Sequence, residues 1–214
     1  MKRIKIEEIF RRLDSSISEP RTELKFESPF HLLIAVILSA QTTDKAVNKV
    51  TSNLFKIAPC ANSLAMLNVK KVEKIIRGIG LYKKKAEFIV KTSKLLLEKH
   101  NGKVPRTRKE LENLPGVGRK TAGVVLNTIY LQGEIAVDTH VFRVSRRLGI
   151  ANSTNLNKVE EELRKIVPNH YKKIAHNLLL LHGRYTCKAQ RPHCSSCLLI
   201  ELCNFGKRSD MVNY

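Results

Sequence analysis

Lys120 stands where a lysine can act as a nucleophile. It follows the turn LPGVG (residues 114–118) and begins a run that is typical of a helix, RKTAGVVLNTIYL. The positive end of a helix dipole and partial burial both disfavour an ammonium ion, so we expect a neutral amine suited to Schiff-base chemistry. A solvent-facing cation is the simpler alternative for a lone lysine, and it stays open.

Asp138 is the carboxylate that could serve this amine. In AVDTHVFRV it precedes a helical pattern, where its simplest role is an N-cap that contributes about 1 kcal/mol. A carboxylate can also take up the proton of an amine or stabilise a developing sugar cation. A cap uses one oxygen, so the two roles are compatible. A close carboxylate favours the ammonium form of Lys120, and the sequence does not decide which effect dominates.

Four cysteines lie within the C-terminal segment CKAQRPHCSSCLLIELC. They follow the spacing C-x6-C-x2-C-x5-C: Cys187, Cys194, Cys197 and Cys203. Thiolates that converge from such a segment suit zinc or an iron–sulfur cluster. With only one tight pair, the spacing favours an iron–sulfur cluster, and zinc remains the alternative; packing of reduced thiols is less consistent with the polar residues between them. The fifth cysteine, Cys60, stands alone and is expected to be a buried apolar residue.

The elements that position these residues are all expected to be helices. SPFHLLIAVILSA begins with a Ser-Pro helix start and is apolar on all sides, which predicts an interior helix. YKKKAEFIVKTSKLLLEKHNG predicts a helix with lysines on the face opposite its apolar positions and a cap near Gly102. STNLNKVEEELRKIVP predicts another, stopped by Pro168. No alternating pattern persists long enough for a strand, so the fold class is all-α.

The turn that precedes Lys120 predicts a hairpin between two helices. Gly116 and Gly118 allow positive φ angles and a close approach by another backbone. Successive amides in front of a helix N-terminus form a site for a phosphate oxygen, a contact that reads no base sequence. A plain helix–helix turn would show the same residues. Farther on, YLQGEIAVDTH (130–140) breaks the helical pattern and is a candidate crossover between two lobes.

The charge balance indicates the kind of partner. The chain has 39 Lys and Arg against 19 Asp and Glu, a formal net charge of +20 over 214 residues. This excess favours a polyanion such as nucleic acid, although a solvated basic surface or an anionic membrane would also accommodate it. The longest apolar run, LLIAVIL, is too short to span a bilayer, and MKRIKIEEIFRRLD is typical of an amphipathic helix rather than a signal peptide. We expect a soluble, cytoplasmic protein.

Several motifs in order resemble one family. LPGVGRKTA, VDTHVFRV, LHGRYTC and the cysteine spacing resemble the helix-hairpin-helix base-excision DNA glycosylases, as do SPFHLLIAVILSAQTTD and IGLYKKKA. The resemblance covers nearly the whole chain. It implies two helical lobes: a helical bundle over 21–132 that carries the hairpin (about 107–131), and a second lobe formed by 1–20 and 133–214 that ends in a cluster loop. The active site would lie in the cleft between them.

The same resemblance implies a reaction and a set of site residues. The substrate would be duplex DNA with an oxidised or ring-saturated pyrimidine, flipped out of the stack, or an already baseless site. Lys120 would form a Schiff base with the sugar, Asp138 would assist, and β-elimination would cut the strand on the 3′ side. One [4Fe-4S] cluster per chain would have a structural role in a monomer that associates with the nucleoid. The residues expected to contact DNA are Gln41, Leu81, Leu114, Gly116, Gly118, Arg119, His140, Lys188 and Arg191.

Three other readings compete with this one. An adenine-excising glycosylase of the same superfamily shares the aspartate and the cluster but does not depend on Lys120, and Ile37 stands where that relative is expected to be acidic. An oxoguanine glycosylase would keep a lysine, but most lack the cysteine tail. A non-catalytic DNA-binding module fits the hairpin, the charge and the cysteines equally well, and only the pairing of Lys120 with Asp138 separates it from an enzyme.

Overall fold

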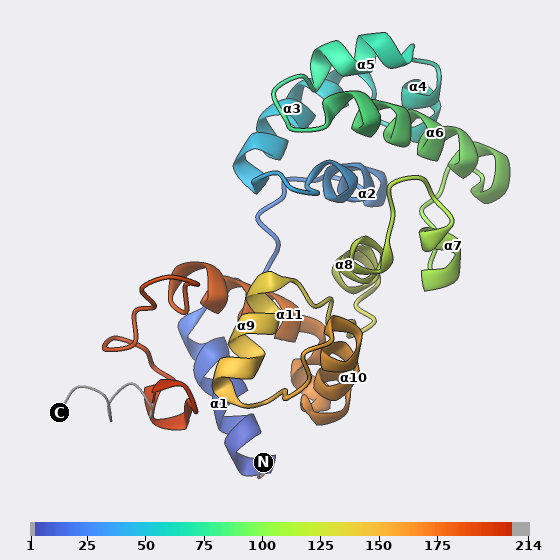
Figure 1. Ribbon diagram of the computed structural model, residues 1–214. Helices are drawn as coiled ribbons and strands as arrows, with labels where there is room; N and C mark the ends of the chain where they lie inside the picture. The colour runs from blue at the N-terminus through green and yellow to red at the C-terminus, as the bar shows by residue number, and fades with distance from the viewer. Residues whose placement is uncertain (1–2, 207–214) are drawn as a thin grey trace. The chain divides into compact units, whose positions relative to one another are not determined.

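The computed structural model describes residues 3–206, and within that range the regular elements are helices without strands (Figure 1). The all-α class is therefore confirmed. The chain divides into two compact units. Thr22–Tyr130 forms the first, here called the hairpin unit; Met1–Arg21 and Leu131–Tyr214 together form the second, the cysteine unit. The boundaries expected from sequence were after residues 20 and 132.

The hairpin unit is built around one buried helix. Its elements are α2 (Pro29–Leu38), α3 (Asp44–Ile57), α4 (Ala61–Ala65), α5 (Val69–Ile75), α6 (Tyr82–His100), α7 (Arg108–Glu112) and α8 (Arg119–Tyr130). Every residue of α2 after Pro29 is buried, and α3, α6 and α8 pack around it (Figure 1). The side chain of Ser28 accepts a hydrogen bond from the backbone N–H of His31, so both the cap and the interior position expected of α2 are confirmed.

Helix α6 departs from its expected pattern at two residues. Its C-terminal turn ends in left-handed residues at Asn101 and Gly102, as the Gly102 cap predicted. Leu97 is 37 % exposed although it is one of the apolar residues of the pattern, whereas Lys85, one of its lysines, is 4 % exposed. The buried face of α6 thus includes a lysine near its N-terminus, which the spacing of the aliphatic residues does not indicate.

The cysteine unit joins the two ends of the chain. Its elements are α1 (Arg3–Ser16), α9 (Thr139–Leu148), α10 (Leu156–Ile166), a 3₁₀ turn (Asn169–Tyr171), α11 (Lys172–Tyr185) and a second 3₁₀ turn (Ile200–Leu202). Both α1 and α9 pack against α11 (Figure 1). Their buried residues form one apolar core, which extends to Leu199 and Cys203 in the C-terminal segment. This core places the cysteine segment against α9 and α11.

No helix in the described range 3–206 combines the length and the apolar character needed to cross a lipid bilayer.

Candidate active site and cysteine centre

The hairpin turn lies between α7 and α8 and is held by two buried side chains. Leu114 is 4 % exposed and Val117 is 6 % exposed, and the N–H of Val117 donates to the carbonyl of Leu114 at 3.1 Å. Gly116 has φ +77°, so the expected positive φ is confirmed there. A Cβ at Gly116 would lie 2.8 Å from Cδ2 of Phe88 and 3.1 Å from Cγ2 of Ile37. The fold itself therefore requires glycine at this position.

Gly118 has a different reason to be glycine. It does not have a positive φ, so that part of the expectation is wrong for Gly118. Apart from its two chain neighbours, no atom of the described residues lies within 4 Å of a Cβ built on it. Packing within residues 3–206 therefore does not exclude a side chain here. The missing side chain instead leaves the backbone at the start of α8 open to an approaching molecule.

Lys120 is the second residue of α8, as the hairpin motif predicted. Its side chain is exposed, so the partial burial expected from sequence is wrong. The neighbouring Arg119 is also exposed, and its carbonyl accepts a hydrogen bond from Nη1 of Arg108 on α7 at 3.2 Å. That contact fixes the end of the turn from which Lys120 projects.

Asp138 belongs to the cysteine unit and caps α9. Its Oδ1 accepts from the backbone N–H of Val141 at 2.8 Å, which confirms the N-cap predicted from sequence. Its Oδ2 lies 3.1 Å from Nδ1 of His140. The Asp138 side chain is only 9 % exposed, whereas that of His140 is 33 % exposed. The carboxylate is thus held in one orientation by the helix that it caps.

The four C-terminal cysteines line one cavity. The space that they help to enclose measures about 350 Å³ including its solvent-open part, and Arg147, His182 and Phe205 are also among its lining residues. Cys203 is buried and the other three are partly buried. Burial raises the pKa of Cys197, and the nearby thiols of Cys203, Cys187 and Cys194 raise it further. Several thiolates in this cavity would therefore require a cationic group to balance them.

Zinc and a polynuclear cluster place different demands on cysteine ligands. Among residues 3–206, no three His, Cys, Asp or Glu side chains are grouped closely enough to hold one metal ion. Zinc would draw its ligands to about 2.3 Å from one centre, whereas a cluster distributes its cysteines over separate iron atoms. The four cysteines and the cavity that they line are thus candidates to hold a metal-containing group.

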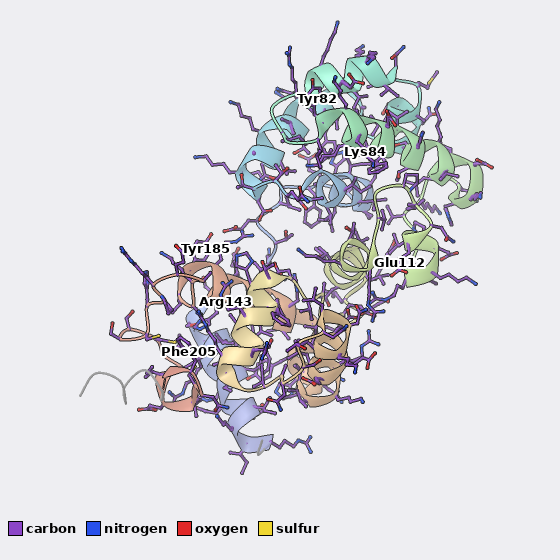
Figure 2. All side chains as sticks on the ribbon, in the orientation of Figure 1. Tyr82, Lys84, Glu112, Arg143, Tyr185 and Phe205 are labelled. Carbon is purple, nitrogen blue, oxygen red and sulfur yellow. The ribbon has the colours of Figure 1, made fainter. Side chains whose placement is uncertain are left out.

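Two arginines of α9 hold the start of the cysteine segment. Arg143, labelled in Figure 2, donates from Nε to the carbonyl of Cys187 at 3.0 Å and from Nη2 to that of Gly183 at 2.8 Å. Arg147 donates from Nη1 to Cys187 Sγ at 3.4 Å and to the carbonyl of Lys188 at 2.7 Å. Sequence reasoning missed both residues, because their partners lie 40 or more positions away in the chain.

The segment after the last cysteine also contacts α9. The guanidinium of Arg147 lies 4.5 Å from the ring centroid of Phe205, which is labelled in Figure 2. The N–H of Phe205 donates to the carbonyl of Arg147 at 3.0 Å. Burial lowers the pKa of His182 to about 4, and its Nε2 lies 3.8 Å from Cys197 Sγ. A neutral imidazole and a cationic arginine therefore flank the sulfur atoms.

The remaining residues expected to contact DNA are mostly at the surface. Gln41 and Leu81 are exposed and both have positive φ, 54° and 58°. Lys188 and Arg191 are exposed on the loop between the first two clustered cysteines. Leu114 is buried, so only its backbone could reach a ligand.

The burial expected for Cys60 is wrong. It is exposed rather than buried, and it precedes the short helix α4 as its N-cap residue. Hydrogen bonds with Ser63 lower the pKa of Cys60. The position is a helix start rather than a packing site.

Known proteins match the chain along its full length. The "Endonuclease III" of Escherichia coli K12 is 51 % identical over 211 residues, which are 99 % of this chain and 100 % of that protein. A solved non-covalent Endonuclease III–DNA complex aligns with a TM-score of 0.92 at 44 % identity and covers 99 % of both chains. A trapped Endonuclease III–DNA covalent intermediate aligns with a TM-score of 0.91 at 44 % identity, covering 98 % of this chain and 99 % of that one.

These relatives confirm the resemblance that the motifs indicated. Among the glycosylases, the proteins that the chain matches here are endonuclease III proteins. Residues 34–169 also match the family described as "HhH-GPD superfamily base excision DNA repair protein". That match includes the hairpin, Lys120 and Asp138. The chain therefore belongs to the HhH-GPD superfamily of base excision DNA repair proteins.

Proposed function

We propose that this protein is a bifunctional DNA glycosylase and AP lyase. It removes oxidised or ring-saturated pyrimidines from duplex DNA and then cuts the strand on the 3′ side of the baseless site. The observation that carries the proposal is the placement of Lys120, exposed and directly behind the glycine turn at the start of α8. A relative 44 % identical to this chain has been captured as a covalent intermediate with DNA.

The chemistry assigns a distinct step to each side chain. Lys120 loses its ammonium proton, and the neutral amine attacks the anomeric carbon of the flipped nucleotide. The bond from that carbon to the base breaks, the base leaves with its electron pair and gains a proton, and the sugar opens to an imine on Lys120. The imine acidifies the adjacent sugar carbon, so loss of its proton expels the 3′ phosphate. Water then hydrolyses the imine and restores the lysine.

Asp138 is assigned the role of proton acceptor and electrostatic partner. A carboxylate takes up the proton that Lys120 must lose, and its charge stabilises the cationic sugar that develops as the base departs. The cap on α9 occupies Oδ1 and holds the side chain in one rotamer. We assign the proton transfer to Oδ2, which lies 3.1 Å from Nδ1 of His140.

The hairpin is assigned the role of phosphate clamp. Gly116 shapes the turn, and Gly118 leaves the backbone amides at the start of α8 open to a phosphate oxygen. The dipole of α8 favours the negative charge at the same place. Lys120 follows within two residues, so one rigid element both grips the strand and presents the nucleophile, which limits the entropy lost on the way to reaction.

Four exposed side chains are assigned to the duplex around the lesion. Gln41 and Leu81 fill the gap left in the stack when the nucleotide flips out, the device of an inserted wedge. Lys188 and Arg191, on the loop held by Arg147, pair with phosphates. Arg119 and His140 supply further polar contacts, and Leu114 contributes through its backbone.

Cys187, Cys194, Cys197 and Cys203 are assigned to one [4Fe-4S] cluster. The group would be structural: it would close a tail that otherwise buries few apolar residues and hold the loop of Lys188 in place. Arg147 donates to the sulfur of Cys187, and such hydrogen bonds stabilise the charge of a bound thiolate.

Borohydride trapping on duplex DNA with a baseless site tests the enzyme assignment. The wild-type protein is expected to yield a covalent protein–DNA adduct, because the imine is reduced to a stable amine. Lys120→Ala is expected to yield none, and the matched control Lys109→Ala, which removes an exposed lysine of α7, is expected to react like the wild type. A wild-type protein that binds DNA without forming an adduct would instead be a non-catalytic binding module or an adenine-excising relative.

A further inference from the structure

Lys85 is buried although nothing in the proposed reaction uses it. It lies in the first turn of α6, is 4 % exposed, and its Nζ donates a hydrogen bond to Oγ1 of Thr42 at 2.8 Å. Burial lowers the pKa of Lys85, which reflects the cost of removing an ammonium ion from water. A lysine side chain is almost never fully buried unless it is paired with another group.

The partner lies beside an exposed tip of the hairpin unit. Thr42 directly follows Gln41, the exposed residue at φ 54° in the segment between α2 and α3. The hydroxyl of Thr42 accepts from Lys85 and donates to the carbonyl of Ala40 at 3.4 Å. The amine of Lys85 thus reaches the backbone on the other side of Gln41 through a single hydroxyl group.

Lys85 is also tied to a second exposed tip. Leu81, at φ 58° and 61 % exposed, is the N-cap residue of α6. The backbone N–H of Lys85 donates to the carbonyl of Leu81 at 3.0 Å. A left-handed conformation costs a non-glycine residue about 1–2 kcal/mol, so each tip persists only where its surroundings hold it.

We propose that Lys85 is a positioning residue that fixes the separation between Gln41 and Leu81 through its hydrogen bond to Thr42. This inference rests on the proposed function, in which both tips enter the DNA stack. Two wedges must fit one gap, and a fixed separation means that inserting one aligns the other without further ordering. Lys85 touches neither DNA nor the reacting atoms; it acts through the two loops.

Thr42→Val tests the proposal with little change of shape. Valine keeps the volume of threonine but lacks the hydroxyl, whereas Thr42→Ser keeps the hydroxyl and serves as the matched control. Two single-turnover rates are compared: excision of a damaged pyrimidine from duplex DNA, and cleavage of a duplex that already lacks the base. Only the first requires a stacked base to be extruded, so only the first depends strongly on the wedges.

Thr42→Val is expected to slow excision about tenfold, since a hydrogen bond to a charged group contributes on the order of 1.5 kcal/mol. Cleavage of the baseless duplex is expected to change less than about twofold, and Thr42→Ser is expected to match the wild type in both assays. In a Lys85→Met background, Thr42→Val is expected to have no further effect on excision, because the bond is already gone.

Three outcomes would overturn the proposal. One is excision by Thr42→Val at the wild-type rate. Another is equal slowing of both reactions, together with a lower melting temperature, which would show that the bond serves only stability. The third is additivity of Thr42→Val and Lys85→Met. A wild-type protein that excises no damaged pyrimidine would overturn the proposed function as well, so the two failures are distinguishable.

Discussion

At the scale of single residues, we assign Asp138 two roles, one to each carboxylate oxygen. Oδ1 holds the first turn of α9, and Oδ2 lies beside His140. The first role needs only a side-chain oxygen, whereas proton uptake needs a carboxylate. A substitution that keeps the oxygen and removes the charge therefore separates the two.

Asp138→Asn is expected to slow base excision by about 10²–10⁴-fold, the usual contribution of a general base. Its melting temperature should stay close to that of the wild type, because asparagine caps helices as well as aspartate does. Single-turnover rates with a DNA-affinity measurement check both points. A variant as active as the wild type would show that the carboxylate serves only as a cap.

Residue identity predicted some of these features and not others. Ser28 and Asp138 cap their helices as expected, because an N-cap depends on the next three residues of the chain. The exposure of Lys120 and Cys60 and the burial of Lys85 were not predicted. Burial depends on which distant segments cover a position, and a single sequence carries no local signal of that.

At the scale of elements, the hairpin contains two glycines with separate physical reasons. Gly116 is required by its φ of +77° and by Phe88 and Ile37, which lie too close to admit a Cβ, whereas a Cβ on Gly118 would face open space. Substituting each glycine separately therefore distinguishes a requirement of folding from a requirement of DNA binding.

Gly116→Ala is expected to lower the free energy of unfolding by at least about 1–2 kcal/mol, the cost of a left-handed alanine. Gly118→Ala should change it by less than about 1 kcal/mol, yet weaken binding to duplex DNA about tenfold, because the methyl group displaces a phosphate from charge-assisted hydrogen bonds. Thermal unfolding and DNA titration of both variants test this. Unchanged DNA affinity in Gly118→Ala would contradict the role of the hairpin as a phosphate clamp.

The cysteine segment is the element on which the cluster assignment depends. Cys194→Ser is expected to lower the iron content of the purified protein and the stability of the cysteine unit, because one iron atom loses its thiolate. Cys60→Ser is the matched control: Cys60 is exposed and lies in the other unit, so the iron content should not change. Purified wild-type protein that carries zinc and no iron would contradict the assignment.

The convergence of the cysteines was predictable from the sequence, whereas the side chains that hold the cysteine segment were not. The spacing of the cysteines predicted that they converge, and the cavity that they line agrees. The roles of Arg143 and Arg147 could not be inferred, because their bonds to the cysteine segment span 40 or more residues and depend on the packing of α9 against α11.

At the scale of the whole molecule, the chain combines two separate cores with a strong excess of positive charge. One core lies within Thr22–Tyr130, and the other joins α1 to the C-terminal half. A local sequence pattern cannot show that residues near the first end of the chain pack beside the last cysteine. The net charge of +20, by contrast, is read directly from the composition.

Binding to undamaged duplex is expected to weaken steeply as salt rises. Contacts with about four phosphates would lower the affinity about a hundredfold between 50 and 200 mM salt. Lys188→Ala should reduce the slope of log affinity against log salt by about one, whereas Lys158→Ala, an exposed lysine of α10 with no assigned contact, should leave it unchanged. A flat salt response in the wild type would count against a DNA clamp.

We assign the covalent bond to DNA to one amine, that of Lys120. The most direct measurement is peptide mapping by mass spectrometry of the borohydride-reduced adduct formed on a baseless duplex. We expect the deoxyribose remnant on the peptide that contains Lys120 and on that residue. An adduct carried by another lysine or by the N-terminal amine would contradict it.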